Sequence, residues 1–217
     1  MTSPNEDCLQ PTDLCDFDRQ PQIKARALEL TAGCRTKEEM FQRLFAFVKE
    51  MPYGLEDWDV AASQTLAKRW GMCSGKANLL VSLLRSVGIP ARYRIIRIKS
   101  EGRLWQWVTE NKELAQRLGP AGAQQDHVAC EVWLGEWRVC DPSRDTPLER
   151  GMIALGMPLE RESASSKPLF SMTLASFDRW ARERQERRRF RENRSETFAE
   201  VNEQFWRIRK LGQGESQ

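Results

Sequence analysis

The chain has 217 residues, of which 40% are apolar and eight are tryptophan, which is enough for one hydrophobic core. Its net charge of +3 is small and its basic C-terminal part is rich in glutamate, so nucleic acid is not indicated as a partner. The N-terminal residues show neither the basic start nor the apolar run of a secretory signal, and no apolar run is long enough to span a membrane. We therefore expect a cytoplasmic protein with no nucleic-acid or membrane partner.

Six cysteines are spread along the chain: Cys8, Cys15, Cys34, Cys73, Cys130 and Cys140. Their even number is compatible with disulfides, but a reducing cytoplasm keeps thiols free. No two of them form a Cys-x-x-Cys pair and the chain has one histidine, so the clustered ligands of a zinc site are missing. The sequence therefore predicts free thiols, no metal site and no cofactor.

The N-terminal part is predicted to be an arm followed by two helices. Residues 1–21 are rich in Pro, Asp and Thr and indicate an extended arm over the surface. A helix is expected over residues 22–32. Its inner face is predicted to be Ile23, Ala27, Leu28 and Leu30. The next helix begins at a capping box of Thr36 and Glu39 and carries an apolar stripe, so it belongs to the core.

The strongest helix signal covers residues 74–87. Apolar residues repeat there at spacings of three and four: Ala77, Leu80, Leu83, Leu84 and Val87. Gly88-Ile89-Pro90 supplies the C-terminal stop. A short helix over residues 61–68 precedes it, and Trp70-Gly71-Met72-Cys73 joins the two. A further helix is expected near residues 109–118.

Three strand patterns are found in the second half of the chain. Residues 92–99 are β-branched and alternate with arginines, which is typical of a strand with one wet face. Two more strands, over residues 127–134 and 137–141, flank Gly135-Glu136. Because a turn this short forms a tight hairpin, the two strands are predicted to be antiparallel neighbours.

The C-terminal part, from about residue 173, has a long and charge-rich helical pattern. Apolar residues are spaced along it: Phe177, Trp180, Phe190, Phe198, Val201, Phe205 and Ile208. Because these side chains need a surface to cover, we expect the segment either to wrap this domain or to join a second copy as a homodimer. The predicted organisation is an N-terminal arm over residues 1–21, a core over residues 22–172 and a C-terminal extension over residues 173–217.

Cys73 is predicted to lie in the first turn of the best-marked helix. Unpaired N–H groups and the positive end of the helix dipole favour an anion there, and thus a thiolate. The same N–H groups could bind the oxyanion of a tetrahedral intermediate, and Gly71 is expected to leave room for a substrate backbone. A cysteine is more often a small buried apolar residue. The other five cysteines, however, have no comparable setting.

His127 is the only histidine available to serve a thiolate as general base. Folding the predicted hairpin about Gly135 places Asp141 opposite residue 129 or 130, within one diagonal of His127. A carboxylate there can orient the ring and stabilise its charged form. A lone histidine is more often structural and an aspartate before proline is usually a turn former. Their joint placement after Cys73 nevertheless favours a catalytic triad of Cys73, His127 and Asp141.

Three segments of the sequence resemble motifs of the transglutaminase-like superfamily. The family's nucleophile motif, a Gly-x-Cys that opens a helix ending in Gly-Ile-Pro-Ala-Arg, is similar to ASQTLAKRWGMCSGKANLLVSLLRSVGIPARY. Its histidine and aspartate hairpin is similar to DHVACEVWLGEWRVCDPSRD, and its preceding helix and loop resemble FQRLFAFVKEMPYG. The three segments stand in the family's order and span about residues 38–145.

This resemblance implies a papain-like α+β fold, with the nucleophile helix packed on an antiparallel β-sheet. It implies that Cys73 is the nucleophile, His127 the base and acid, and Asp141 the orienting carboxylate. The implied activity is acyl transfer or hydrolysis at an amide or peptide bond through a thioester, with a peptide or acyl-amide substrate. The chain resembles the peptidase or amidase members more than the large calcium-dependent cross-linkers, so hydrolysis is favoured.

Two other functions are compatible with the sequence. A non-catalytic binding or scaffold module would keep the fold without the chemistry, although the presence of all three triad residue types argues against it. An acetyltransferase of the arylamine type would use the same triad. Two places are compatible with the tryptophans Trp70, Trp105 and Trp107: the wall of an acyl-substrate groove, or the hydrophobic core and its rim. Three roles are compatible with the basic residues Arg92, Arg94, Arg97 and Lys99: they attract an acidic substrate, they steady the thiolate, or they form the solvated face of a strand.

Overall fold

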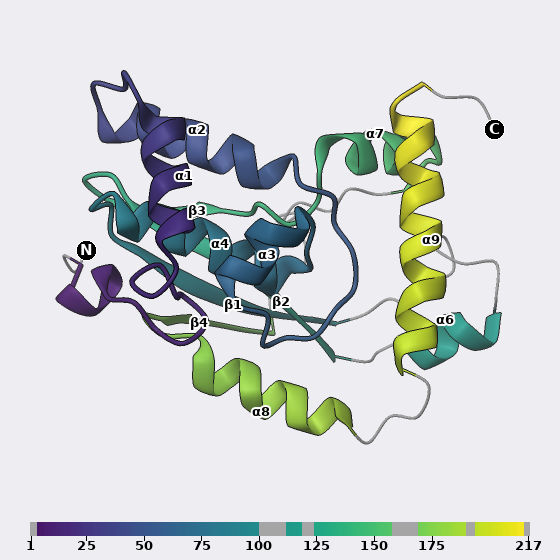
Figure 1. Cartoon of the computed structure of the whole chain (residues 1–217). Helices are drawn as coiled ribbons and strands as arrows, with labels where there is room; N and C mark the ends of the chain where they lie inside the picture. Colours follow the sequence, from purple (N-terminus) through teal and green to yellow (C-terminus); the bar gives the residue numbers. More distant parts are fainter. Residues whose placement is uncertain (1–3, 100–111, 119–123, 158–168, 190–193, 215–217) are drawn as a thin grey trace.

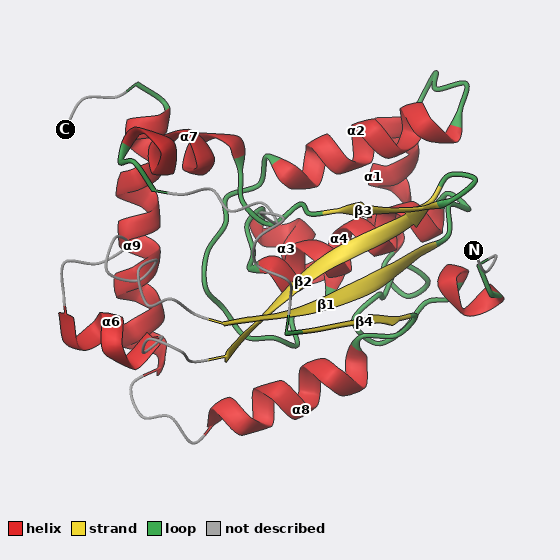
Figure 2. Ribbon diagram, turned by 180° about the vertical axis from the view of Figure 1, so that it is seen from behind, coloured by secondary structure: helices red, strands yellow, loops and turns green. Residues whose placement is uncertain are grey.

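One antiparallel sheet, covered on one face by helices, forms the centre of the protein (Figures 1 and 2). The computed structural model describes residues 4–99, 112–118, 124–157, 169–189 and 194–214. Within these residues the sheet has four strands in the order β3-β2-β1-β4. Their bounds are β1 Ala91–Lys99, β2 Gln124–Trp133, β3 Trp137–Cys140 and β4 Phe170–Leu174. This arrangement confirms the predicted α+β fold class.

Four helices on the same side of the sheet contain most of the residues that were predicted to form the hydrophobic core. Their bounds are α1 Pro21–Thr31, α2 Lys37–Lys49, α3 Ala62–Lys68 and α4 Cys73–Ser86. Each begins and ends close to its predicted position, because capping residues and glycines mark the ends locally. A short 3-10 helix, η1 (Glu6–Leu9), precedes them. Among the described helices, none combines the length and apolarity needed to cross a membrane.

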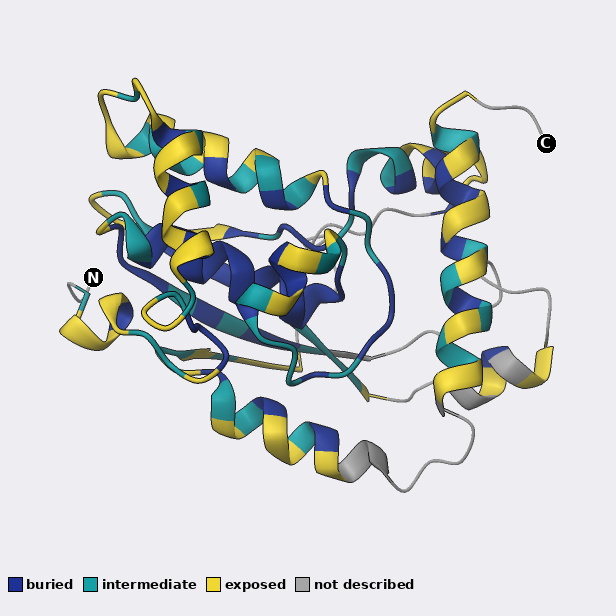
Figure 3. Ribbon diagram, in the orientation of Figure 1, coloured by how far each residue is buried: buried dark blue, intermediate teal, exposed yellow. Residues whose placement is uncertain are grey.

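Helix α4 is the centre of the core. Every residue from Cys73 to Arg85 is buried, and the helix contacts β1, β2 and the helices α1, α2 and α3 (Figure 3). A helix with so little exposed surface needs partners on all sides. Arg85 binds two further chain segments to the helix, because its guanidinium donates to the carbonyls of Gln10 and Ala175 at 2.5 and 2.6 Å. The N-terminal arm and the start of the C-terminal extension are thereby bound to the end of α4.

Two predicted details of the first helices are wrong. Leu28 was assigned to the inner face of α1, but its side chain is 54% exposed. The buried residues Ile23, Ala27 and Thr31 are spaced by four, and Leu28 lies about 100° around the helix from Ala27. In α2 the Thr36 hydroxyl accepts from the Glu39 N–H as predicted, whereas the Glu39 carboxylate accepts from the N–H of Arg35 instead of completing the box.

The β2–β3 hairpin has a three-residue loop. Trp133 pairs with Trp137, so Leu134 joins Gly135 and Glu136 in the turn that was expected to hold two residues. Leu134 N–H donates to the Glu136 carbonyl, and Gly135 has a φ of 91°, which favours glycine. The register beyond the turn is nevertheless set by Cys130 opposite Cys140.

The C-terminal third differs most from the prediction. Strand β4 straddles the predicted boundary at residue 173 and pairs with β1, so the sheet extends into the expected extension. The extension then contains two helices, α8 (Asp178–Arg189) and α9 (Arg194–Gly212). Helix α7 (Thr146–Ala154), which the pattern analysis did not predict, follows β3. Helix α6 (Lys112–Leu118) matches the end of a predicted helix, whereas 109–111 and Phe190 lie outside the described residues.

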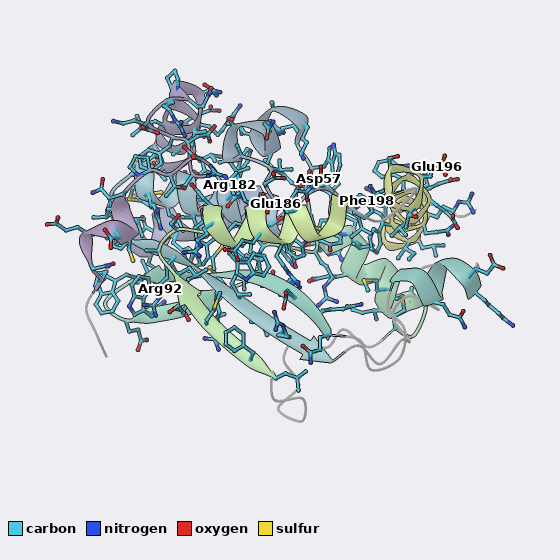
Figure 4. All side chains as sticks on the ribbon, turned by 90° about the horizontal axis from the view of Figure 1, so that it is seen from below. Asp57, Arg92, Arg182, Glu186, Glu196 and Phe198 are labelled. Carbon is cyan, nitrogen blue, oxygen red and sulfur yellow. The ribbon has the colours of Figure 1, made fainter. Side chains whose placement is uncertain are left out.

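Helix α8 packs against its own domain. Phe177, just before α8, is fully buried and stacks on Tyr93 of β1 with ring centroids 5.1 Å apart. Trp180 contacts the Trp58 ring edge to face at 5.2 Å. Seen from below, α8 lies in front with Arg182 labelled on it, and Arg182 forms an ion pair with Asp13 of the arm (Figure 4). The described part of the extension thus wraps the domain, while a homodimer stays a prediction.

Helix α9 crosses α7 at very close range. A Cβ atom on Gly151 would lie 1.8 Å from the Ile208 carbonyl oxygen, so only glycine fits there. Beside this crossing, Arg209 donates through Nε and Nη2 to both carboxylate oxygens of Asp145, at 2.9 and 2.7 Å. Arg209 and Asp145 are both buried, and Arg209 also donates to the Tyr53 carbonyl. A paired, hydrogen-bonded charge cluster therefore joins α9 to the core.

We predict that Gly151→Ala lowers the free energy of unfolding by about 1–3 kcal/mol, because the added methyl group forces α7 and α9 apart. Thermal unfolding followed by circular dichroism measures the loss. The exposed neighbour on α7 gives a control, Arg150→Ala, which should change stability by about 0.5 kcal/mol or less. Equal stability of the two variants would contradict the close crossing.

We predict that Arg209→Met lowers the free energy of unfolding by about 3–5 kcal/mol at pH 7, because the buried Asp145 carboxylate loses its charged partner. On the same helix, Arg207→Met removes only an exposed ion pair with Glu203 and should cost about 0.5 kcal/mol or less. Urea unfolding of both variants and the wild type makes the comparison, and equal midpoints for the two variants would contradict it.

The same ion pair predicts an acid-sensitive stability. Burial would raise the pKa of Asp145, but the Arg209 side chain and the N–H groups of Tyr53 and Leu148 hold it below its usual value. A lowered carboxyl pKa stabilises the fold above the unfolded value of about 4, and this stabilisation is lost as the pH falls through the lowered pKa. The difference between wild type and Arg209→Met should therefore shrink at pH 3.

Candidate active site

Cys73 is the first residue of α4, at the amino end of the core helix. Its preceding residue Met72 is extended, with φ −74° and ψ 173°, and the first intrahelical bond runs from Lys76 N–H to the Met72 carbonyl. The N–H groups of the first turn therefore have no partner within the helix. Together with the helix dipole they favour an anion at the Cys73 sulfur. Cys73 itself is only 3% exposed.

A buried carboxylate holds the turn that leads into Cys73. Glu56 accepts from the Met72 N–H at 2.8 Å with one oxygen and forms an ion pair with Lys68 through the other. A Cβ atom on Gly75 would lie 2.5 Å from the Glu56 carboxylate, and one on Gly71 would lie 3.0 Å from it. The expectation that Gly71 leaves room for a substrate is therefore wrong. The space beside both glycines is filled by the protein's own acid.

His127 and Asp141 meet where β3 ends beside β2. The ring Nε2 of His127 and the carboxylate Oδ2 of Asp141 are 2.8 Å apart. Strand β3 ends at Cys140, opposite Cys130, so Asp141 falls one residue beyond, opposite Ala129. The other carboxylate oxygen, Oδ1, accepts from the Ser143 N–H at 2.9 Å. With Nε2 engaged by Asp141, the ring nitrogen Nδ1 is left for Cys73.

The electrostatics of the pair favour a charged imidazole beside the thiol. Burial alone would lower the pKa of His127, but the Asp141 carboxylate and the neighbouring Cys73 side chain hold it well above its usual value. For Asp141, burial would raise the pKa, and the charged His127 and the Ser143 hydrogen bonds outweigh this and keep the pKa well below its usual range. The three candidate residues Cys73, His127 and Asp141 thus form one contiguous cluster.

The site opens to solvent on the side of the imidazole and carboxylate. The side chains of His127 and Asp141 are 30% and 41% exposed, in contrast to the buried Cys73. A reactant would therefore reach the sulfur past these two side chains. A separate cavity of about 370 Å³ lies between β1, β4 and α8, and none of the three cluster residues lines it.

Several residues at the site were not singled out from the sequence. Lys76, one turn after Cys73, is fully buried and donates to three backbone carbonyls. Burial lowers the pKa of Lys76 to about 7, although Asp145 and Asp141 favour its charged form. A lysine inside the otherwise apolar pattern of α4 was the visible signal, as was the acid Glu56 in the preceding loop.

The accessory residues proposed from the sequence have partners within the protein. The Trp70 ring is half-buried beneath the Lys68 ammonium, 4.4 Å from the ring centroid, whereas Trp105 and Trp107 lie outside the described residues. The arginines of β1 are paired with carboxylates of β2. These pairs are Arg92 and Arg94 with Glu131, and Arg97 with Asp126. They are thus neither a fully solvated face nor free charges for a substrate. No cluster of metal ligands occurs among the described residues.

Comparison with known proteins places the chain in a family. The family model of the transglutaminase-like superfamily matches residues 24–142, more than half of the chain, including the three cluster residues. No curated protein matches by sequence. A solved structure of a candidate cysteine protease from Cytophaga hutchinsonii is similar, with 20% identity, a TM-score of 0.47, and coverage of 65% of this chain and 43% of that one. The extent of the family match shows that the chain belongs to the transglutaminase-like superfamily.

Proposed function

We propose that the protein is a cysteine-dependent enzyme that cleaves or exchanges an amide or peptide bond through a thioester on Cys73. Membership of the superfamily supports a cysteine-dependent enzyme in general. The observation that carries the finer proposal is the 2.8 Å contact of His127 with Asp141, together with Cys73 at the amino end of α4. The Cys73 side chain is among the neighbours that raise the pKa of His127. The fold alone would not distinguish an enzyme from a binding module.

In the first half of the proposed reaction, the Cys73 thiolate attacks the carbonyl carbon of the amide. The charge that moves to the carbonyl oxygen is stabilised by N–H groups of the first turn of α4, which have no partner within the helix. Protonated His127 then gives its proton to the nitrogen of the leaving amine as the carbon–nitrogen bond breaks. Asp141 keeps the ring in place and stabilises its charged form. The products of this step are a free amine and a thioester on Cys73.

In the second half, the thioester is resolved by an acceptor. Neutral His127 takes a proton from water or from an amine, the acceptor adds to the carbonyl carbon, and the Cys73 sulfur leaves as a thiolate. Water yields a carboxylic acid and an amine acceptor yields a new amide. We propose hydrolysis, as in a peptidase or amidase, with a peptide or acyl-amide substrate and a cytoplasmic location.

We predict that iodoacetamide labels Cys73 about tenfold or more faster than Cys34 at pH 6, because the charged His127 imidazole stabilises the thiolate form, which is the form that reacts. Cys34 is the stringent comparator, because it is half-exposed whereas Cys73 is buried. Burial raises the pKa of the Cys8, Cys15 and Cys130 thiols, which should label slowly. Peptide mapping by mass spectrometry over a time course gives the individual rates.

The matched variant for this experiment is His127→Gln. It should remove the advantage of Cys73 at pH 6 and have a much smaller effect at pH 9, where thiols ionise without a partner. If wild-type Cys73 is labelled no faster than Cys34, the catalytic proposal fails and a non-catalytic module becomes the better description.

We predict that a peptide and acyl-amide library contains substrates that the wild type turns over, and that Cys73→Ala slows turnover about a thousandfold or more. Removal of another thiol, Cys34→Ala, should leave turnover unchanged. Mass spectrometry of the intact protein with acetyl-CoA examines the alternative acetyltransferase. An acetyl adduct on Cys73, with no turnover of any amide, would replace amide cleavage by acetyl transfer.

A further inference from the structure

We propose that Lys76 is a positioning residue of the active site, whose ammonium group holds the segment after β3 so that Asp141 faces His127. The inference deepens the proposed function and rests on it. Lys76 acts on the reacting groups indirectly, through Ser143 and Asp141.

The side chain of Lys76 is fully buried and its three donors are all used. Nζ donates to the carbonyl oxygens of Lys49 at 3.1 Å, Met51 at 2.6 Å and Ser143 at 2.8 Å. An ammonium group has three N–H bonds and no acceptor, so three carbonyls match it fully. Two chain segments far apart in the sequence, the end of α2 and the loop after β3, are thus bound to one nitrogen atom.

The loop after β3 carries the carboxylate that the chemistry needs. The carbonyl of Ser143 accepts from Lys76, and the N–H of the same residue donates to Asp141 Oδ1 at 2.9 Å. The remaining oxygen, Oδ2, lies 2.8 Å from His127 Nε2. A continuous path of contacts therefore runs from Lys76 through Ser143 and Asp141 to His127.

This path begins on the helix turn that also carries the Cys73 thiol. Lys76 stands three residues after Cys73, so both project from neighbouring positions of α4. The helix that carries the sulfur therefore also carries the anchor for the carboxylate that orients the imidazole.

Packing alone does not explain a lysine at this position. Burying an ammonium is costly, and an apolar side chain of similar volume often fills such a site without loss of stability. The charged groups that face Lys76 are of both signs: Asp141, Asp145, Lys49 and Arg209. A neutral amine would have two N–H bonds for three carbonyls. The three contacts therefore favour the charged form, in opposition to the burial that lowers the pKa of Lys76 to about 7.

The test is the pH dependence of Cys73 alkylation by iodoacetamide in the full chain, with Lys76→Met compared to wild type. Lys76→Met should slow labelling about tenfold or more at pH 6 and less than about twofold at pH 9, because only low-pH reactivity depends on an oriented imidazolium. A general loss of stability would not produce this split between the two pH values. Circular dichroism and thermal unfolding confirm that each variant is folded.

The matched control is Lys49→Met. It removes the ion pair of Lys49 with Glu149 beside the same segment but leaves the Lys49 carbonyl that Lys76 contacts. Its ratio of labelling rates at pH 6 and pH 9 should equal that of wild type. If Lys76→Met does not fold, Lys76→Gln takes its place. It should also slow Cys73 labelling at pH 6, because an amide has fewer donors than an ammonium group.

This design distinguishes three outcomes. A folded Lys76 variant that keeps the wild-type ratio of rates overturns the positioning role and leaves the proposed function intact. Wild-type protein whose Cys73 labels like an ordinary thiol at both pH values overturns the proposed function, and the positioning role with it. Slower Cys73 labelling at pH 6 in the Lys76 variant, and not in Lys49→Met, supports the inference.

Discussion

The complete burial of α4 is the constraint on which the rest of the structure depends. A helix with no exposed face between Cys73 and Arg85 must be covered by the sheet, by three other helices and by segments from both ends of the chain. The helix is thereby held against β2, which carries His127, with Asp141 just beyond the end of β3. Position and burial together give the sulfur a stable electrostatic partner, because both the helix end and the imidazole are held by the same core.

Buried charges organise the loops around this helix. Glu56 holds the turn before Cys73, Lys76 holds two loops behind it, and Asp145 with Arg209 attaches α9. Each of these groups is costly to bury and each is matched by hydrogen bonds or an opposite charge. The loops that carry Asp141 and the turn before Cys73 are thus held by directional contacts, which define geometry more narrowly than apolar packing does.

Local signals account for the elements that were predicted well. Glycine and proline end α4, the Thr36 cap begins α2, and a short turn sets the register that brings Asp141 near His127. Signals of this kind act within a few residues and need no knowledge of the fold. The missed elements depend on distant partners. Strand β4 has no buried residue and is defined by pairing with β1, and α7 is covered by α9.

The sequence by itself determined the fold class, the ends of α4 and the candidates Cys73, His127 and Asp141. Helix caps and a hairpin register depend only on residues close together in the chain, and a single histidine leaves no choice of base. Only the tertiary structure decided what surrounds them. It placed Glu56 in the space beside Gly71, turned Lys76 into a buried contact of three carbonyls, and assigned the arginines of β1 to carboxylates of β2. Such pairings join residues far apart in the chain, and only the packed fold brings their atoms together.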